Sequence, residues 1–549
     1  MSIDCFAKLI SGILMGVSLL LNTGCVSIDR WAVFDETDGR PPLRNEQIDT
    51  ADYSKFFQGD MPEYVKTPVM EKPLSDVPGG VAMLDLSVEQ AAMMTLKNNR
   101  DLKVNQLNPA IAGTFEQIER GDFDPEWFVE MTYFNEKATE TSRATGEQFG
   151  VKGTDVDSVA GVRQKLPTGT AIEATVSHQG NRSDRAPDQQ TARVGLSLTQ
   201  SLLRGFGPAV NLAGVRQARL GVSASLFELR GYIESLLADS ETAYWQYVLA
   251  EKEIAIFENS LAVVKQQRDE IEQKIEVGLL PETEAAAARA QVATHEQSLI
   301  DARSLLEERR LRLLRKITPG PAGRFDLEIN AVSDPFVPVE PLTNLLDRIR
   351  LADQARPDLN EARQRLRQNK LETAVTANGL LPKLDFFVAL GRTGYADNFS
   401  DAFGELDGNT YDYAAGVSLS GLIGNRVARG RDEEAGLLFR QAAEAVANMR
   451  QMVELDVRLA VNEVERAREQ IGASKVTRQL EEEKLQAEKE RFDVGAGTSL
   501  LVAQAQRDLL ISRIAEVRAV INYRIALVKL YLAEGSLLER RGVGVSLVY

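Results

Sequence analysis

Apolar residues alternate with small or polar residues in four stretches of this chain, and this period of two predicts β-strands. Two of the stretches lie at 191–200 and 410–420, and the other two begin near Trp127 and Leu384. In the first stretch, one face carries Ala192, Val194, Leu196 and Leu198, and the other carries Arg193, Gly195, Ser197 and Thr199. Strands of this kind fit a sheet that crosses a membrane, but a soluble β-sandwich shows the same alternation. The pattern leaves both architectures open.

Elsewhere apolar residues recur at helical spacing over long stretches. Residues 211–277 contain no proline and predict a helix about 100 Å long, at 1.5 Å per residue. The segment that follows carries a heptad of Val292, Leu299, Leu306 and Leu313, and residues 510–531 carry apolar positions three or four apart. Such stripes indicate helices that pack on one another as in coiled coils.

The chain repeats itself. Leu102 corresponds to Leu359 at an offset of 257, Gly195 corresponds to Gly416 at an offset of 221, and KIEVG at 274–278 matches RFDVG at 491–495. The offset falls by 36 (257 − 221) between the first two matches, so about 36 additional residues lie in the strand region of the first repeat. Within them, residues 161–180 predict one more hairpin, which brings the expected number of strands to about six.

These patterns divide the chain into six segments, and each repeat is expected to run from a helix through strands to two long helices. The segments are a signal peptide at 1–24, an irregular lipid-anchored leader at 25–83, repeat one at 84–316, a Pro/Gly-rich connector at 317–342, repeat two at 343–536 and a C-terminal tail at 537–549.

The N-terminus predicts export. Residues 9–21 form an apolar run of 13 residues, which suits a signal peptide and is shorter than a membrane-spanning helix. The run ends in Leu-Asn-Thr-Gly before Cys25. This end resembles a bacterial lipobox, although Asn22 stands where leucine is usual. We expect Cys25 to be lipidated after cleavage, with an exported chain in which Cys25 is incidental as the alternative.

Composition narrows the class of function. A net charge of −16 argues against a nucleic-acid-binding groove, which needs clustered Lys and Arg. The chain has two His and two Cys, and none of these residues stand together at metal-ligand spacing. No catalytic constellation or phosphate-binding loop is recognisable. We therefore expect no enzyme activity, no cofactor and no metal site.

Two similar turns, within 274–291 and 491–508, each join two long helices. Gly278 and Gly495 permit the positive φ of a helix C-cap, and the return helices open at Glu282 and Ser499. We expect both turns to lie at one end of the molecule, as far as possible from the strands.

At these residues the chain resembles the TolC-like outer-membrane efflux protein family. The matching stretches include LSVEQAAMMTLKNNRDL, QSLLRGFGP, AYWQYVLA, RPDLNEARQRL, GLLPKLD and the two tip segments, and they span about residues 84–536. The resemblance implies an α+β, mainly α fold, in which duplicated helical hairpins form a periplasmic coiled-coil tunnel and transmembrane β-strands are pooled into a trimeric barrel. The family usually contributes four strands per chain. The extra hairpin expected here would either widen the ring of strands or protrude from it.

The resemblance also implies a function and partners. It implies a lipoprotein homotrimer in outer-membrane lipid, reaching into the periplasm of a Gram-negative-type bacterium. The trimer would give passive exit to substrates delivered by an inner-membrane transporter and a periplasmic adaptor, in efflux or type I-like secretion. The alternative is a lipid-anchored coiled-coil scaffold of the cell envelope without channel activity. A periplasmic adaptor is disfavoured, because the chain has two hairpins and two strand blocks.

Two groups of residues follow from the resemblance. Tunnel-constriction positions fall on Glu284, Leu501 and Gln504, so a trimer would carry a ring of three Glu284 carboxylates beside a ring of Leu501; the alternative is that Glu284 only solvates a turn. The turns that would contact an adaptor, or merely cap helices, contain Val277, Gly278, Leu279, Val494, Gly495 and Ala496.

Overall fold

The structure is a computed structural model that describes residues 83–141, 143–184, 186–318, 325–336, 342 and 344–543. The signal peptide, Cys25, the leader up to residue 82 and the last six residues lie outside the described residues. Of the two compact units into which the chain divides, the one at 53–547 contains everything described below. Among the described residues, no helix combines the length and the apolar character that crossing a membrane requires.

Six strands form one antiparallel sheet in the order β2-β3-β4-β5-β7-β8. Their bounds are Glu126–Thr141 (β2), Gln148–Lys165 (β3), Thr170–Ser183 (β4), Ala186–Ser201 (β5), Lys383–Ala396 (β7) and Tyr411–Ser420 (β8). Four strands come from the first repeat and two from the second, in agreement with the expected number. The extra hairpin predicted at 161–180 is longer in the structure. Its first strand, β3, begins at Gln148, and its second strand, β4, ends at Ser183. Each of them is paired on both sides within the sheet.

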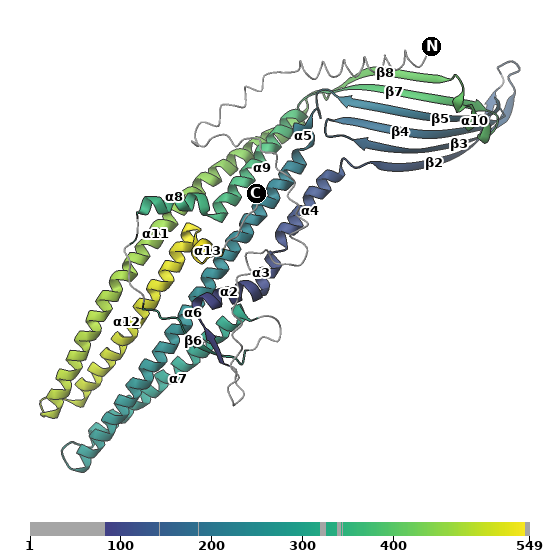
Figure 1. Cartoon of the computed structure of the whole chain (residues 1–549). Coiled ribbons are helices and arrows are strands. Elements are labelled where there is room, and N and C mark those ends of the chain that lie inside the picture. Colours follow the sequence, from purple (N-terminus) through teal and green to yellow (C-terminus); the bar gives the residue numbers. More distant parts are fainter. Residues whose placement is uncertain are drawn as a thin grey trace. The chain divides into compact units, whose positions relative to one another are not determined.

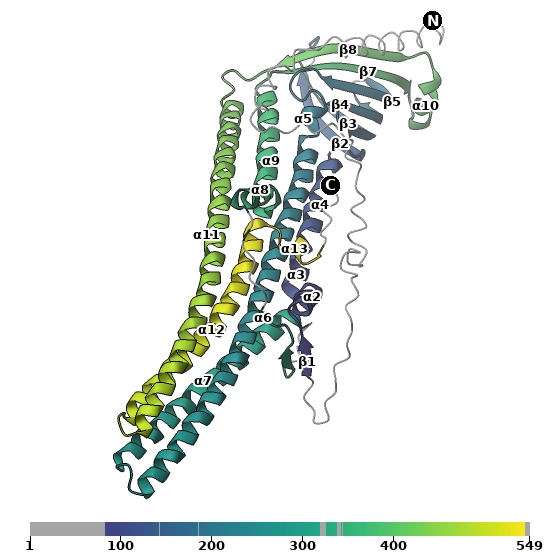
Figure 2. The ribbon, with the colours of Figure 1, turned by 60° about the vertical axis from the view of Figure 1, so that its left-hand side comes forward.

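The long helices form two hairpins. The first consists of α6 (Ala213–Glu276) and α7 (Thr283–Ile317), and the second of α11 (Arg426–Asp493) and α12 (Ser499–Glu534). The 64-residue α6 confirms the expected helix. Its sequence contains no proline, the residue that most strongly breaks a helix. The shorter helices α4 (Asn108–Gly121) and α9 (Pro357–Gly379) lie beside α6 on the sheet side of the hairpins (Figure 1, Figure 2).

Short elements pack against the two hairpins near their middle. The helices α2 (Val88–Asn98), α3 (Arg100–Asn105) and α13 (Leu537–Arg540) and the short parallel strands β1 (Met83–Leu86) and β6 (Glu328–Ala331) join α6 in two hydrophobic clusters that α12 also enters, whereas α8 (Leu345–Ala355) packs on α11 and α12. Tyr244 and Tyr247 of α6 are buried here and donate their hydroxyls to the carbonyls of Leu86 and Ile329, at 3.0 and 2.6 Å. The sequence missed this strand pair, because four residues are too few to show an alternation and residues 317–342 read as a connector.

Candidate functional site: the hairpin tips and the two faces of the sheet

The two helix-joining turns share one backbone geometry. Gly278 has φ +75° and Gly495 has φ +77°. The amide of Gly278 donates to Ile275 and that of Leu279 to Lys274, and in the second turn Gly495 and Ala496 donate to Phe492 and Arg491. This pair of bonds is the Schellman motif, which ends a helix with one left-handed residue. Each hydrogen-bonded residue of the first turn has its counterpart 217 positions later in the second turn.

The candidate adaptor-contact residues are all exposed. Val277, Leu279 and Val494 are 70%, 74% and 79% exposed, and Gly278, Gly495 and Ala496 are also open to solvent. Apolar side chains that are this exposed are not buried by the rest of the chain, so they add little to the stability of its fold. Helix capping explains the two glycines but not the valines and leucine beside them.

Polar contacts fasten the two tips to each other. Lys274 of α6 forms an ion pair with Asp493 of α11 at 3.0 Å, and its ammonium lies 5.1 Å from the centre of the Phe492 ring. The tips therefore lie together, as the sequence predicted. The pair itself was missed, because the sequence does not show which faces of the two hairpins meet.

The candidate constriction residues lie near this contact but in different surroundings. The half-buried carboxylate of Glu284 accepts a hydrogen bond from the hydroxyl of Ser499, the first residue of α12. Leu501 and Gln504 are exposed on α12. Glu284 therefore faces the second hairpin of its own chain, where its hydrogen-bond partner is Ser499 and not one of the other two candidate residues.

The sheet has two contrasting faces. One row across all six strands consists of Trp127, Val162, Ala174, Leu196, Leu390 and Tyr413. The large apolar residues at the two edges of this row, Trp127 and Tyr413, are 77% and 72% exposed. The next row, on the opposite face, consists of Phe128, Gly161, Thr175, Gly195, Gly391 and Asp412. The predicted alternation thus produces an exposed apolar face and a face of mainly small and polar residues.

Ion pairs lie across the polar face. Arg193 of β5 reaches over β7 to Asp412 of β8 with two hydrogen bonds of 2.5 Å. At the other edge, Arg163 of β3 forms a bidentate pair with Glu126 of β2 at 2.9 and 3.0 Å. The sequence placed Arg193 on this face, but only the strand register identifies its partner.

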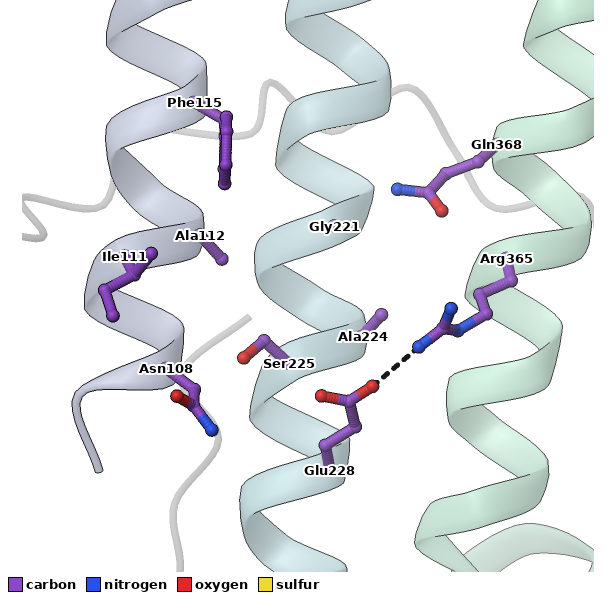
Figure 3. A pocket seen from close by; sticks show the side chains of 10 residues that line it. All are labelled: Asn108, Ile111, Ala112, Phe115, Gly221, Ala224, Ser225, Glu228, Arg365 and Gln368. Carbon is purple, nitrogen blue, oxygen red and sulfur yellow. Dashed lines mark hydrogen bonds and ion pairs between the residues drawn. The ribbon is translucent and has the colours of Figure 1, made fainter. Parts of the chain in front are cut away.

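A groove runs between α4 and α9 over α6 (Figure 3). Its volume is about 370 Å³; Ile111 and Phe115 of α4 line one side, and Arg365 of α9 lines the other. Arg365 donates to Glu228 of α6 at 2.7 Å. The groove therefore has one apolar and one charged wall.

Among the described residues there is no cluster of three or more potential metal ligands.

Comparisons with known proteins agree with this geometry. Residues 349–536 match the family model described as outer membrane efflux protein. The solved structure of the outer-membrane channel OprN is similar with a TM-score of 0.62 and 18% identity, over 82% of this chain and 90% of that one. The Campylobacter jejuni outer membrane channel CmeC gives 0.60 and 17%, over 82% and 86%, and the Vibrio cholerae outer membrane protein VceC gives 0.61 and 15%, over 82% and 96%. No curated protein matches the chain.

Proposed function

Since this chain carries an outer membrane efflux protein domain over residues 349–536 and has the fold of solved outer-membrane channels, we propose that it is a passive exit duct in the outer membrane. Both comparisons lead to channel proteins and not to an enzyme. The duct would carry substrates that an inner-membrane transporter and a periplasmic adaptor deliver.

The two-faced sheet is the observation that carries this proposal. Its apolar face is exposed and suits lipid, whereas its polar face suits water. Among the described residues, β2 pairs with β3 alone and β8 with β7 alone, so both edges of the described sheet are open. An open edge is a template for another strand. Three copies joined edge to edge, with β8 of each copy beside β2 of the next, would close the sheet around an aqueous pore.

Exposed apolar stripes on the helices support the same assembly. Met452, Leu455 and Leu459 of α11 follow helical spacing and are all more than half exposed. Ile111, Phe115 and Ile118 form a similar stripe on α4, beside the groove described above. Stripes of this kind are typical of surfaces that pack against another protein. We assign the α11 stripe of one copy to the α4 side of its neighbour.

The remaining parts of the proposal concern the tips and the anchor. The exposed Val277, Leu279 and Val494, with Gly278, Gly495 and Ala496, would contact the adaptor. Glu284, Leu501 and Gln504 would narrow the tunnel next to them. Lipidation of Cys25 would tether the chain to the outer membrane.

The first experiment is single-channel recording of the purified protein in a planar bilayer, with its native mass measured in parallel. A trimer with discrete openings is the expected result. A monomer or dimer without conductance would reject the duct and favour the lipid-anchored scaffold. If a trimer is silent, the variant Lys274→Ala, which removes the ion pair between the tips, is expected to produce openings.

The constriction assignment has its own test. Three carboxylates held near the pore axis attract cations. Glu284→Gln should therefore weaken block of the open channel by divalent cations at least several-fold, without changing the trimer mass. The matched control is Glu282→Gln, an exposed carboxylate two residues before Glu284. Equal block in both variants would remove Glu284 from the constriction.

A further inference from the structure

A second pocket lies where the helices meet the sheet. It is bounded by three parts of the chain: the segment that joins α4 to β2, the β3–β4 turn and the start of α6 (Figure 1). Its volume is about 530 Å³, within the range of about 300–1,000 Å³ that small-molecule sites occupy. The lining combines four apolar residues with three arginines and one aspartate. The pocket is therefore large enough, and varied enough in chemistry, to hold an amphipathic ligand.

The pocket adjoins the apolar face of the sheet. Gln164 of β3 lies on the same face as Val162, because the two residues are two positions apart along the strand. The side-chain amide of Gln164 donates to the backbone carbonyl of Phe123 at 2.9 Å, and Phe123 lines the pocket. The pocket thus lies at the helix end of the face that the proposed function assigns to lipid.

Apolar side chains are exposed at the same boundary. Phe206, between β5 and α6, is exposed, and so are Leu422 and Ile423, between β8 and α11. Arg426, the first residue of α11, follows them and is exposed as well. Exposed apolar groups beside a cation are typical of segments at a lipid headgroup layer, where the apolar groups enter the acyl region and the cation stays in water.

The pocket carries more positive than negative charge. Arg120 and Arg219 share one carboxylate, that of Glu116, at 2.7 and 2.9 Å. Burial would raise the pKa of Glu116, but the hydrogen bonds from the two arginines outweigh burial and lower it, so this carboxyl is ionised at neutral pH. Asp124 is the other acid, at the lining itself. Three guanidiniums face these two carboxylates, because Arg216 also lines the pocket, is exposed and forms no ion pair among the described residues.

We infer that this pocket binds the phosphate of an anionic phospholipid in the inner leaflet of the outer membrane, with Arg216 as its main contact. The inference rests on the proposed position of the sheet in lipid. A guanidinium presents its donors in a planar fork that fits two phosphate oxygens. Phe123 and Leu212 provide an apolar wall for the glycerol and the first acyl carbons, which a free phosphate ion would not use. One site per chain gives three bound lipids in the proposed trimer.

The test counts lipids bound to the purified full chain by native mass spectrometry. The protein, in neutral detergent, is titrated with phosphatidylglycerol and, separately, with zwitterionic phosphatidylcholine. We expect one tightly bound phosphatidylglycerol per chain and weaker binding of phosphatidylcholine. Arg216→Gln should weaken phosphatidylglycerol binding about five-fold and Arg216→Glu about 25-fold, because each unit of charge near a lipid headgroup changes the affinity by about five-fold. Equal affinities of the wild type and both variants would overturn the inference.

The matched control is Arg507→Gln. Arg507 is exposed on the tip half of α12, far from the sheet along the hairpin, and forms no ion pair among the residues that the structure describes. This variant should bind phosphatidylglycerol as the wild type does. If both Arg216 variants fail to fold, Arg120→Gln removes a second guanidinium of the same pocket and should also weaken binding about five-fold. Unchanged binding in that variant would reject the site.

Two soluble competitors distinguish a lipid site from a phosphate site. Inorganic phosphate and glycerol 3-phosphate, at the same concentration as the lipid, should leave phosphatidylglycerol bound, because neither of them has acyl chains. Displacement by either compound would mean that the pocket takes a soluble phosphate and would overturn the lipid assignment. The same spectra report the mass of the assembly. Absence of a trimer would reject the duct, whereas the number of lipids per chain tests the pocket in any oligomeric state.

Discussion

At the scale of single residues, backbone conformation fixes the hairpin turns. Gly278 and Gly495 adopt positive φ, a region that costs other residues about 1–2 kcal/mol. Gly278→Ala should therefore lower the free energy of unfolding by about 1 kcal/mol, measured by chemical denaturation. The control Gly472→Ala lies within α11 with open space around it and should raise stability by about 1 kcal/mol. Equal effects of the two substitutions would contradict this account of the turn.

A buried carboxyl makes stability depend on pH. Glu234 of α6 is 1% exposed and bonded to Arg230 at 3.2 Å, and burial raises the pKa of its carboxyl from 4.5 to about 7. Because the folded pKa exceeds the unfolded one, this contribution to stability is complete below about pH 4.5 and is lost as the pH rises through 7.

The variant Glu234→Gln should not lose this contribution. Relative to the wild type, its free energy of unfolding should increase between pH 4.5 and 8 by up to about 3 kcal/mol. Denaturation of both proteins at pH 4.5, 6 and 8 measures the difference, in which the other titrating groups cancel. A difference that stays constant with pH would refute the role of Glu234.

At the scale of elements, the two faces of one strand should respond oppositely to charge. Val417 and Ser418 are neighbours on β8 and both are exposed, but Val417 lies on the apolar face. Val417→Arg should cost about 2–4 kcal/mol if that face meets lipid, and should lower recovery of the protein in outer membranes. Ser418→Arg faces Asp385 across the strand pair and should be recovered normally. Equal recovery would mean that the apolar face does not meet lipid.

Sequence patterns predicted the elements better than their contacts. The alternation at Val194 and Leu196 and the proline-free stretch of α6 are local properties, so strand faces and helix length could be read from them. The bond from Ser499 to Glu284 and the pair of Arg193 with Asp412 join residues more than 200 positions apart. Such contacts depend on how two hairpins or three strands align, and no local pattern records that alignment.

At the scale of the whole molecule, assembly should depend on the apolar stripe of α11. Leu455→Glu combined with Leu459→Glu places two carboxylates on this exposed stripe and should abolish the trimer or make it dissociate at much lower temperature. Arg458→Ala is the control, because it removes a surface pair with Glu454 worth about 0.3–0.5 kcal/mol. Native mass and heat stability are the measurements. A trimer that tolerates both carboxylates would place the interface elsewhere.

The open edges of the sheet have a consequence for the life of the chain before assembly. Strands β2 and β8, of 16 and 10 residues, form the two edges of the sheet among the described residues. In the proposed function, a newly exported copy would expose two unpaired sheet edges and an apolar surface to water. Such a copy would aggregate unless its concentration in the periplasm stayed low or a chaperone bound it. Overproduction should therefore cause aggregation in the periplasm sooner than it fills the outer membrane.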